Sequence, residues 1–288
     1  MSSDLELKEL TTEDRKDVDT FLHTCRYTHH HWEFRSPLDG LGSRAYLAVH
    51  QDGEMVGVLD CPPGSGGASW LRLFAADPVF NLQQIWKTLW GAAKDRLPNQ
   101  ETVHVLASSF WLPGLLQEST FQHINDIVVL ERKPSSADRP PGPPGITIRW
   151  MKEEDLEDVY AIDQAAFAPL WRISREEVHA ASLTGNVATL AVAGKKIIGY
   201  QISSANSQGA KLMRIAVHPD HQGSGAGTAL LNHLLQAVTS WGNLRVILNT
   251  QKTNRRSIRL YKKFGFTPSK TYPVFQYSCS QDGLCGAG

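Results

Sequence analysis

The sequence predicts an α/β (α+β) protein made of two consecutive copies of one fold, each a sheet flanked by helices. A stretch rich in proline and glycine at 133–145 has the composition of an extended linker and divides the 288 residues into two similar halves. Patterns typical of strands and of amphipathic helices alternate on both sides of it. We therefore expect one domain at 1–132, the linker at 133–145 and a second domain at 146–288.

The two halves share short stretches at an offset of 141 residues, counted from position 5 to position 146. LELKEL at 5–10 resembles ITIRWM at 146–151. At the same offset Pro78 corresponds to Pro219, and each proline ends a strand-like run. Self-similarity at a fixed spacing indicates a repeated structural unit. We expect two divergent copies of one domain.

Composition and charge are those of an ordinary globular protein. Hydrophobic residues make up 41% and charged residues 20%, and 29 Lys and Arg balance 29 Asp and Glu. This balance gives no reason to expect a nucleic acid or a membrane surface as partner. No apolar run approaches the ~18 residues of a membrane span. The acidic, polar first residues are unlike a secretion signal, and we expect a cytoplasmic protein.

The four cysteines are scattered along the chain. Cys279 and Cys285 are close enough in sequence to pair, but no histidine or cysteine completes a metal-ligand set at a known spacing. We therefore expect no metal site.

The second half begins with a strand and two helices. Residues 146–150 alternate between apolar and polar, which predicts a strand. Residues 153–167 carry apolar side chains at helical spacing. Ser174 is followed three residues later by Glu177, a capping box that predicts a helix over 174–182.

Three strands come next, two of them joined by a hairpin. The runs 187–192 and 197–204 flank Ala-Gly-Lys at 193–195, which is typical of a tight turn, and 211–217 is the third strand. The remaining elements are, in order, a helix at 225–241 with one apolar face, a strand at 245–249, a helix at 254–264 and a strand at 275–278.

The loop between the third strand and the next helix has almost no side chains. It reads Gln-Gly-Ser-Gly-Ala-Gly at 222–227. The first N–H groups of a helix lack partners within the helix and lie at the positive end of its dipole. Because glycines allow close approach, the loop is suited to a pyrophosphate.

Two other families of glycine-rich loops need residues that this sequence does not provide. A Walker loop would need a lysine after Gly227, and a dinucleotide-binding loop would need an acidic residue about twenty positions on. Neither is present.

The motifs together resemble the GCN5-related N-acetyltransferases (GNAT). Gln-x-x-Gly-x-Gly after a strand ending in Val-x-Pro resembles motif A of that family. Asn254, followed seven residues later by Tyr261 and then by Gly-Phe at 265–266, resembles motif B. Residues 166–171 resemble the first-helix region of the ribosomal-protein-alanine acetyltransferase branch. The likeness spans about 146–266, and the tandem layout resembles that of mycothiol synthases.

The resemblance implies a mixed, mostly antiparallel twisted sheet in which two strands, ending at Val217 and Thr250, splay apart to admit the pantetheine arm of acetyl-CoA. It also implies a set of residues in contact with this cosubstrate. Backbone groups of Ile215 and Val217 would bind the acetyl group and the arm, and Asn254 would touch the arm. The pyrophosphate would rest on the N–H groups of Gln222, Gly223, Ser224, Gly225, Ala226 and Gly227. Tyr261 would contact the cosubstrate and act as the catalytic acid that protonates the leaving thiolate.

The acceptor implied by the resemblance is a primary amine, carried by a small molecule or a peptide. Its general base stays open, because the glutamate of the ribosomal-protein branch is replaced here by Asn249. Possible substitutes are Glu176, Glu177, His179, His218 or a water molecule. Two other functions also stay open, a CoA-binding sensor without turnover and a protein N-terminal or lysine acetyltransferase.

The first half lacks the residues of such a site. Asn-Leu-Gln-Gln-Ile at 81–85 stands where the glycine loop should be, and Leu116 falls opposite Tyr261. We expect a degenerate copy that binds no CoA and replaces the second subunit of a dimer, and hence a monomer. The run His29–His31 is interpreted as a loop, with the lining of a substrate pocket between the two domains as the alternative.

Overall fold

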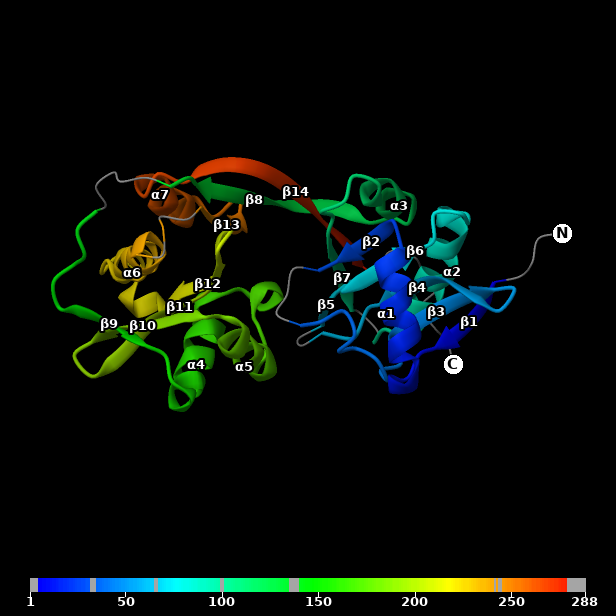
Figure 1. The fold of residues 1–288 in the computed structure, drawn as a ribbon, viewed down its shortest axis with the longest axis horizontal. Coiled ribbons are helices and arrows are strands. Elements are labelled where there is room, and N and C mark those ends of the chain that lie inside the picture. Colours follow the sequence, from blue (N-terminus) through cyan, green and yellow to red (C-terminus); the bar gives the residue numbers. More distant parts are fainter. Residues whose placement is uncertain are drawn as a thin grey trace. The chain divides into compact units, whose positions relative to one another are not determined.

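The computed structural model describes residues 5–31, 35–64, 67–98, 101–134, 140–240, 242 and 245–278 (Figure 1). The chain forms two compact units. Unit 1 comprises Met1–Asn125 and Tyr272–Gly288, and unit 2 comprises Asp126–Thr271. Cys279 and Cys285 lie outside the described residues. Among those described, no cluster of potential metal ligands occurs, and no helix is long and apolar enough to cross a membrane.

Unit 1 contains a five-stranded sheet in the order β1-β3-β4-β6-β2. Its elements are β1 (Glu6–Glu9), η1 (Thr12–Asp14), α1 (Arg15–Thr24), β2 (Tyr27–His30), β3 (Tyr46–Gln51), β4 (Glu54–Asp60), β5 (Ala68–Trp70), β6 (Leu73–Ala76), α2 (Leu82–Lys94), β7 (Thr102–Leu106) and α3 (Leu112–Glu118). Helix α2 buries Trp86 and Trp90 in a core that also contains Phe74 and Leu116.

In unit 1, two residues of the histidine run belong to a strand, and helix α2 begins with an ordinary polar cap. His29 and His30 belong to strand β2, where they pair with Phe74 and Leu73, so the expected loop is wrong at these residues. Burial lowers the pKa of His29 to about 4. Asn81 caps α2, because its side-chain oxygen accepts the N–H of Gln84 at 3.1 Å. An ordinary polar cap therefore begins this helix.

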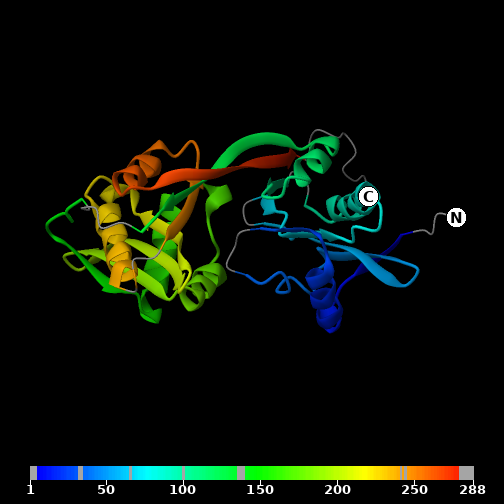
Figure 2. The same cartoon turned by 45° about the horizontal axis from the view of Figure 1, so that its top comes forward.

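Unit 2 is a mixed, mostly antiparallel sheet with helices on both faces, as expected. Its elements are β9 (Ile146–Trp150), η2 (Glu153–Asp155), α4 (Leu156–Ala166), η3 (Pro169–Trp171), α5 (Arg175–Thr184), β10 (Val187–Ala193), β11 (Lys196–Asn206), β12 (Gly209–Val217), η4 (Pro219–His221), α6 (Ala226–Ser240), β13 (Val246–Gln251) and α7 (Arg255–Lys263). The strand order is β8-β13-β12-β11-β10-β9, and only β12 and β13 pair in parallel. Figure 2 shows α6 and α4 on opposite sides of this sheet.

Two long strands run from one unit into the other. Strand β8 (Gln122–Arg132) pairs through Ile127–Arg132 with β13 of unit 2. Strand β14 (Thr267–Ser278) pairs through Val274–Ser278 with β7 of unit 1. The expected division placed 126–132 in the first domain and 272–288 in the second. In the structure 126–132 belongs to unit 2 and 272–278 to unit 1, because each final strand hydrogen-bonds to the sheet of the other copy.

Candidate functional site

The site begins where strands β12 and β13 separate. They pair only through Ala210–Leu212 and Val246–Leu248, although β12 continues to Val217 and β13 to Gln251. The predicted splay of the two strands is therefore confirmed. A polar backbone edge left in this way offers N–H and C=O groups to an extended ligand, as an added strand would use them.

A β-bulge lies at the start of the splay. On β11 the consecutive residues Ile202 and Ser203 face Arg214 and Leu212, so that Met213 is an extra residue on β12. A bulge bends its strand and increases the local twist. The bulge coincides with the end of the pairing between β12 and β13 at Leu212.

The opening between the strands is a cavity of about 720 Å³, and all its lining residues belong to unit 2. It unites nine of the ten predicted cosubstrate residues: Ile215, Val217, Gln222, Gly223, Gly225, Ala226, Gly227, Asn254 and Tyr261. Ser224 lies in the same loop but is not among the lining residues; its hydroxyl accepts the N–H of Ala226 at 3.4 Å.

The glycines of the loop are required by backbone conformation and by packing. Gly223 and Gly225 have φ angles of +94° and +92°, which disfavour residues with a Cβ. A Cβ at Gly225 would also lie 2.8 Å from Cγ of Pro143, and one at Gly227 would lie 3.2 Å from Leu260. The loop therefore presents backbone rather than side chains at the beginning of α6.

Basic residues of α7 line the cavity, and one of them contacts this loop. Arg256 Nη1 donates to Gln222 Oε1 at 2.5 Å, and Gln222 Nε2 donates to the carbonyl oxygen of Val217 at 3.2 Å. Arg259 and Lys263, also on α7, line the same cavity. No Asp or Glu occurs among its described lining residues. The charge distribution suits a ligand with several negative charges. Sequence reasoning missed Arg256, although basic residues recur along 255–263.

The end of α7 fixes the position of Tyr261. The N–H of Phe266 donates to the Tyr261 carbonyl at 3.1 Å, and the N–H of Gly265 donates to the Lys262 carbonyl at 3.0 Å. With φ of +79° at Gly265, this is a Schellman cap. The Phe266 ring packs on the Tyr261 ring at 5.9 Å between centroids. The Gly-Phe motif thus anchors the tyrosine.

Tyr261 is buried, and its environment keeps the phenol protonated. Burial raises its pKa to about 12, while a hydrogen bond with Ser257 acts in the opposite direction. The hydroxyl therefore carries its proton throughout the neutral range. A protonated phenol can donate a hydrogen bond, and it cannot serve as a base there.

Other predicted residues have local structural roles. The Asn254 side chain accepts the N–H of Ser257 at 3.1 Å and caps α7, while the residue also lines the cavity. The predicted capping box of α5 is confirmed, since Glu177 Oε2 accepts the N–H of Ser174 at 2.7 Å. Glu177 is thereby committed to the helix end.

The remaining base candidates do not line this cavity either. Glu176 and His179 are absent from its lining, and His218 lines a different cavity of about 580 Å³ beside α4. Asn249 and His221 do line it. The imidazole of His221 was missed by sequence reasoning, because it lies three residues after His218 in an unremarkable turn.

Comparison with known proteins places this site in a family. Residues 156–266 match the Acetyltransferase (GNAT) family. The [Ribosomal protein bS18]-alanine N-acetyltransferase of Escherichia coli K12 is 31% identical over 121 residues, which are 42% of this chain and 80% of that enzyme. The chain belongs to the GNAT family of acetyltransferases and is an acyltransferase, as the motifs predicted.

Two solved structures share the fold over nearly the whole chain. A tandem GNAT protein from the clavulanic acid biosynthesis pathway superposes with a TM-score of 0.68 at 16% identity and covers 96% of this chain and 98% of its own. A GCN5-related N-acetyltransferase from Sphaerobacter thermophilus gives a TM-score of 0.64 at 19% identity, with 95% of each chain covered. Both units thus fall within a known architecture.

Proposed function

We propose that this chain transfers the acetyl group of acetyl-CoA to a primary amine, by direct attack in a ternary complex at a single site in unit 2. The observation that carries the proposal is the cavity between the splayed strands, which unites the glycine loop, the exposed edge of β12 and Tyr261. The first copy, with a capped helix in place of the loop, would bind no CoA.

Backbone groups of unit 2 would bind and orient acetyl-CoA. N–H groups of Gln222–Gly227 hold the pyrophosphate, with Arg256 beside them. Backbone groups of Ile215 and Val217 orient the pantetheine arm and polarise the acetyl carbonyl. Holding both reactants together supplies much of the rate.

Chemistry requires one proton to leave the amine and one to reach the sulfur. The amine nitrogen attacks the carbonyl carbon, the C–S bond breaks, and the departing thiolate takes its proton. Because the pKa of Tyr261 is about 12 and that of a thiol about 8.5, the phenol stabilises the developing thiolate by donating a hydrogen bond. The proton that the amine loses balances the proton that the sulfur finally gains. Without a carboxylate in the described lining, the amine enters in its neutral form or loses its proton to water or His221.

The test is thiol release from acetyl-CoA across a panel of small amines and peptides, including peptides with N-terminal alanine. We expect amine-dependent release that falls about 10²–10⁴-fold in Tyr261→Phe. Tyr160→Phe is the matched control, because Tyr160 stacks with Arg175 in unit 2 and does not line the cavity. CoA binding without amine-dependent release would instead support a sensor, and activity on peptides alone a protein acetyltransferase.

A further inference from the structure

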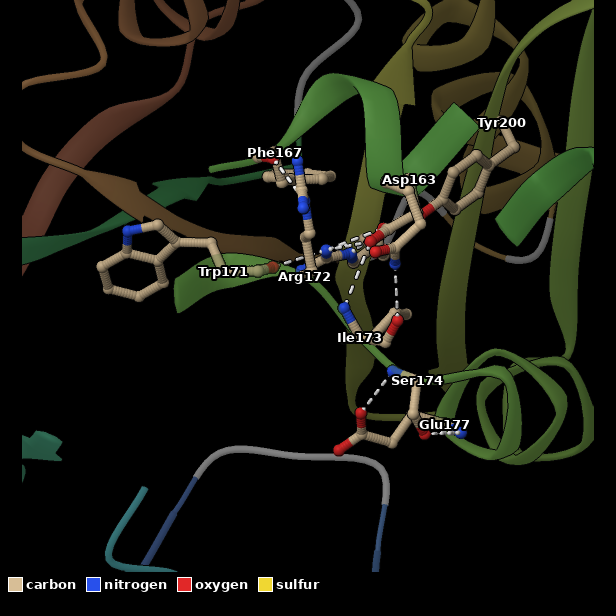
Figure 3. Close-up of polar contacts among 10 residues, drawn as sticks. Asp163, Phe167, Trp171, Arg172, Ile173, Ser174, Glu177 and Tyr200 are labelled. Atoms are coloured by element: carbon tan, nitrogen blue, oxygen red, sulfur yellow. Dashed lines mark hydrogen bonds and ion pairs between the residues drawn. The ribbon is translucent and has the colours of Figure 1, made fainter. Parts of the chain in front are cut away.

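A buried ion pair joins helix α4 to strand β12. Asp163 has no exposed surface. It accepts hydrogen bonds from Arg214 Nε at 2.7 Å and Nη2 at 2.9 Å, and from the Tyr200 hydroxyl at 2.5 Å. Burial raises the pKa of Tyr200, which keeps it a donor. Figure 3 shows the Asp163 carboxylate at the centre of these contacts. A two-pronged guanidinium–carboxylate pair fixes direction as well as distance.

The same pair holds the segment 167–173, which follows α4. Arg214 Nη2 donates to the carbonyl oxygen of Trp171 at 2.7 Å, and its guanidinium carbon lies 3.8 Å from the centre of the Phe167 ring. The N–H of Ile173 donates to Asp163 at 3.2 Å. The segment's only regular structure is the short η3 turn. Gln164 Nε2 also donates to the Ile173 carbonyl oxygen at 2.9 Å. Arg214 and Asp163 thus tie the segment to β12 as well as to α4.

This segment forms one wall of the cavity. Phe167 and Trp171 line it, as does Arg214 itself. Arg214 stands between the bulge residue Met213 and Ile215, in the part of β12 that has left β13. A single side chain therefore connects the strand edge proposed to bind the acetyl group with the wall of Phe167 and Trp171.

We propose that Arg214 is a positioning residue for the acceptor. With Asp163, it holds Phe167 and Trp171 as a wall of the cavity at a fixed distance from the acetyl-binding edge of β12. The part of the acceptor molecule that bears the amine packs against this wall. This inference rests on the proposed function and adds to it the surface that receives the acceptor. The wall presents two aromatic residues, and the charge of Arg214 is neutralised by Asp163. An acceptor with an apolar or aromatic body beside its amine fits this surface.

The test uses Arg214→Lys in the full chain, with Arg149→Lys as the matched control. Lysine keeps the charge opposite Asp163, but one ammonium cannot reproduce a fork that reaches both carboxylate oxygens and the Trp171 carbonyl. Arg149 makes the same two-pronged pair with Asp155, at 2.6 and 2.7 Å, and does not line the cavity. Tyr200→Phe is a milder second variant, because it removes one hydrogen bond to Asp163 and leaves the ion pair.

For Arg214→Lys we expect the KM for the best amine of the panel to rise at least tenfold, while the KM for acetyl-CoA and the Kd for CoA stay within twofold. Amide hydrogen exchange should quicken over 167–173 and stay unchanged in β10. Tyr200→Phe should change both quantities in the same direction by less, and Arg149→Lys should change neither.

An unchanged amine KM, an equal rise in both KM values, or unchanged exchange over 167–173 would each overturn the proposal. Failure of the proposed function has a separate signature, which is the absence of thiol release by the unaltered chain with every amine. In that event the exchange measurement still decides whether Arg214 orders the cavity wall.

Discussion

Replacement of Leu130 by alanine tests where the second unit begins. Leu130 lies before the linker and belongs to the first half of the sequence. In the structure it has no exposed surface and packs in one core cluster with Leu248, Phe264 and Tyr261 of unit 2. Leu130→Ala should therefore destabilise unit 2 and loosen the surroundings of Tyr261. Leu116→Ala is the matched control, since this equally buried leucine belongs to the core of unit 1.

The size of the effect follows from burial. A fully buried leucine replaced by alanine loses about 2–5 kcal/mol of unfolding free energy, through lost transfer free energy and the cavity left behind. At about 2–4 °C per kcal/mol for a domain of this size, the midpoint of the affected transition should fall by roughly 4–20 °C. Both variants should show losses in this range, but in different units.

Amide hydrogen exchange followed by peptide mass analysis localises the loss. In Leu130→Ala, exchange should quicken in β13 and at 261–266, and remain unchanged in β7. In Leu116→Ala the pattern should be reversed. Quickened exchange in β7 with unchanged exchange in β13 on Leu130→Ala would refute the assignment of β8 to unit 2.

Three further predictions concern the site. Tyr261 must be protonated to donate, and its pKa is about 12, so activity should show no descending limb between pH 7 and about 10. Tyr261→Phe should lower the pH–rate profile without changing its shape. A descending limb below pH 10 that vanishes in Tyr261→Phe would contradict this prediction. Gly225→Ala should lower the free energy of unfolding, measured in urea, by about 2–4 kcal/mol, because of the positive φ and the clash with Pro143. Gly194 has a positive φ in open space, so Gly194→Ala should lower it by about 1–2 kcal/mol and leave CoA affinity unchanged. Arg256→Ala should weaken CoA binding about tenfold by calorimetry at low salt and less at high salt, and an effect independent of salt would exclude a role as a phosphate partner.

The parts of the site that sequence predicted are those with local signals. Ser174 and Glu177 are three residues apart and complete a cap on their own. The Gly-Phe pair lies directly after the helix that it ends, so Tyr261 could be placed from its neighbours alone. The splay was predicted through the family resemblance, and the loop through the conformational freedom of its glycines.

The parts that sequence did not predict depend on contacts between distant residues. Asp163 and Arg214 are 51 residues apart, and neither belongs to a recognisable motif. A lone aspartate on a helix and a lone arginine on a strand are ordinary residues until the fold brings them together. The histidine run was placed in a loop because its pairing with Phe74 and Leu73, more than forty residues away, leaves no trace in its own sequence.

Strands β8 and β14 each pair with the sheet of the other copy, and the sequence did not predict this because the partners are again distant residues. This pairing also contributes residues to the cavity. Each strand ends its copy, and apolar patterning alone does not distinguish pairing with β7 from pairing with β13. Because β8 pairs with β13, Ile127 lies in the lining of the cavity and Leu130 in the core cluster that contains Tyr261. It also lets Arg132 Nε donate to the Phe264 carbonyl at 3.0 Å, directly beside the cap that anchors Tyr261. A cut at the linker would remove these three contacts from the cavity and its surroundings, so the first half of the sequence, which has no glycine loop, supplies a strand that belongs to unit 2.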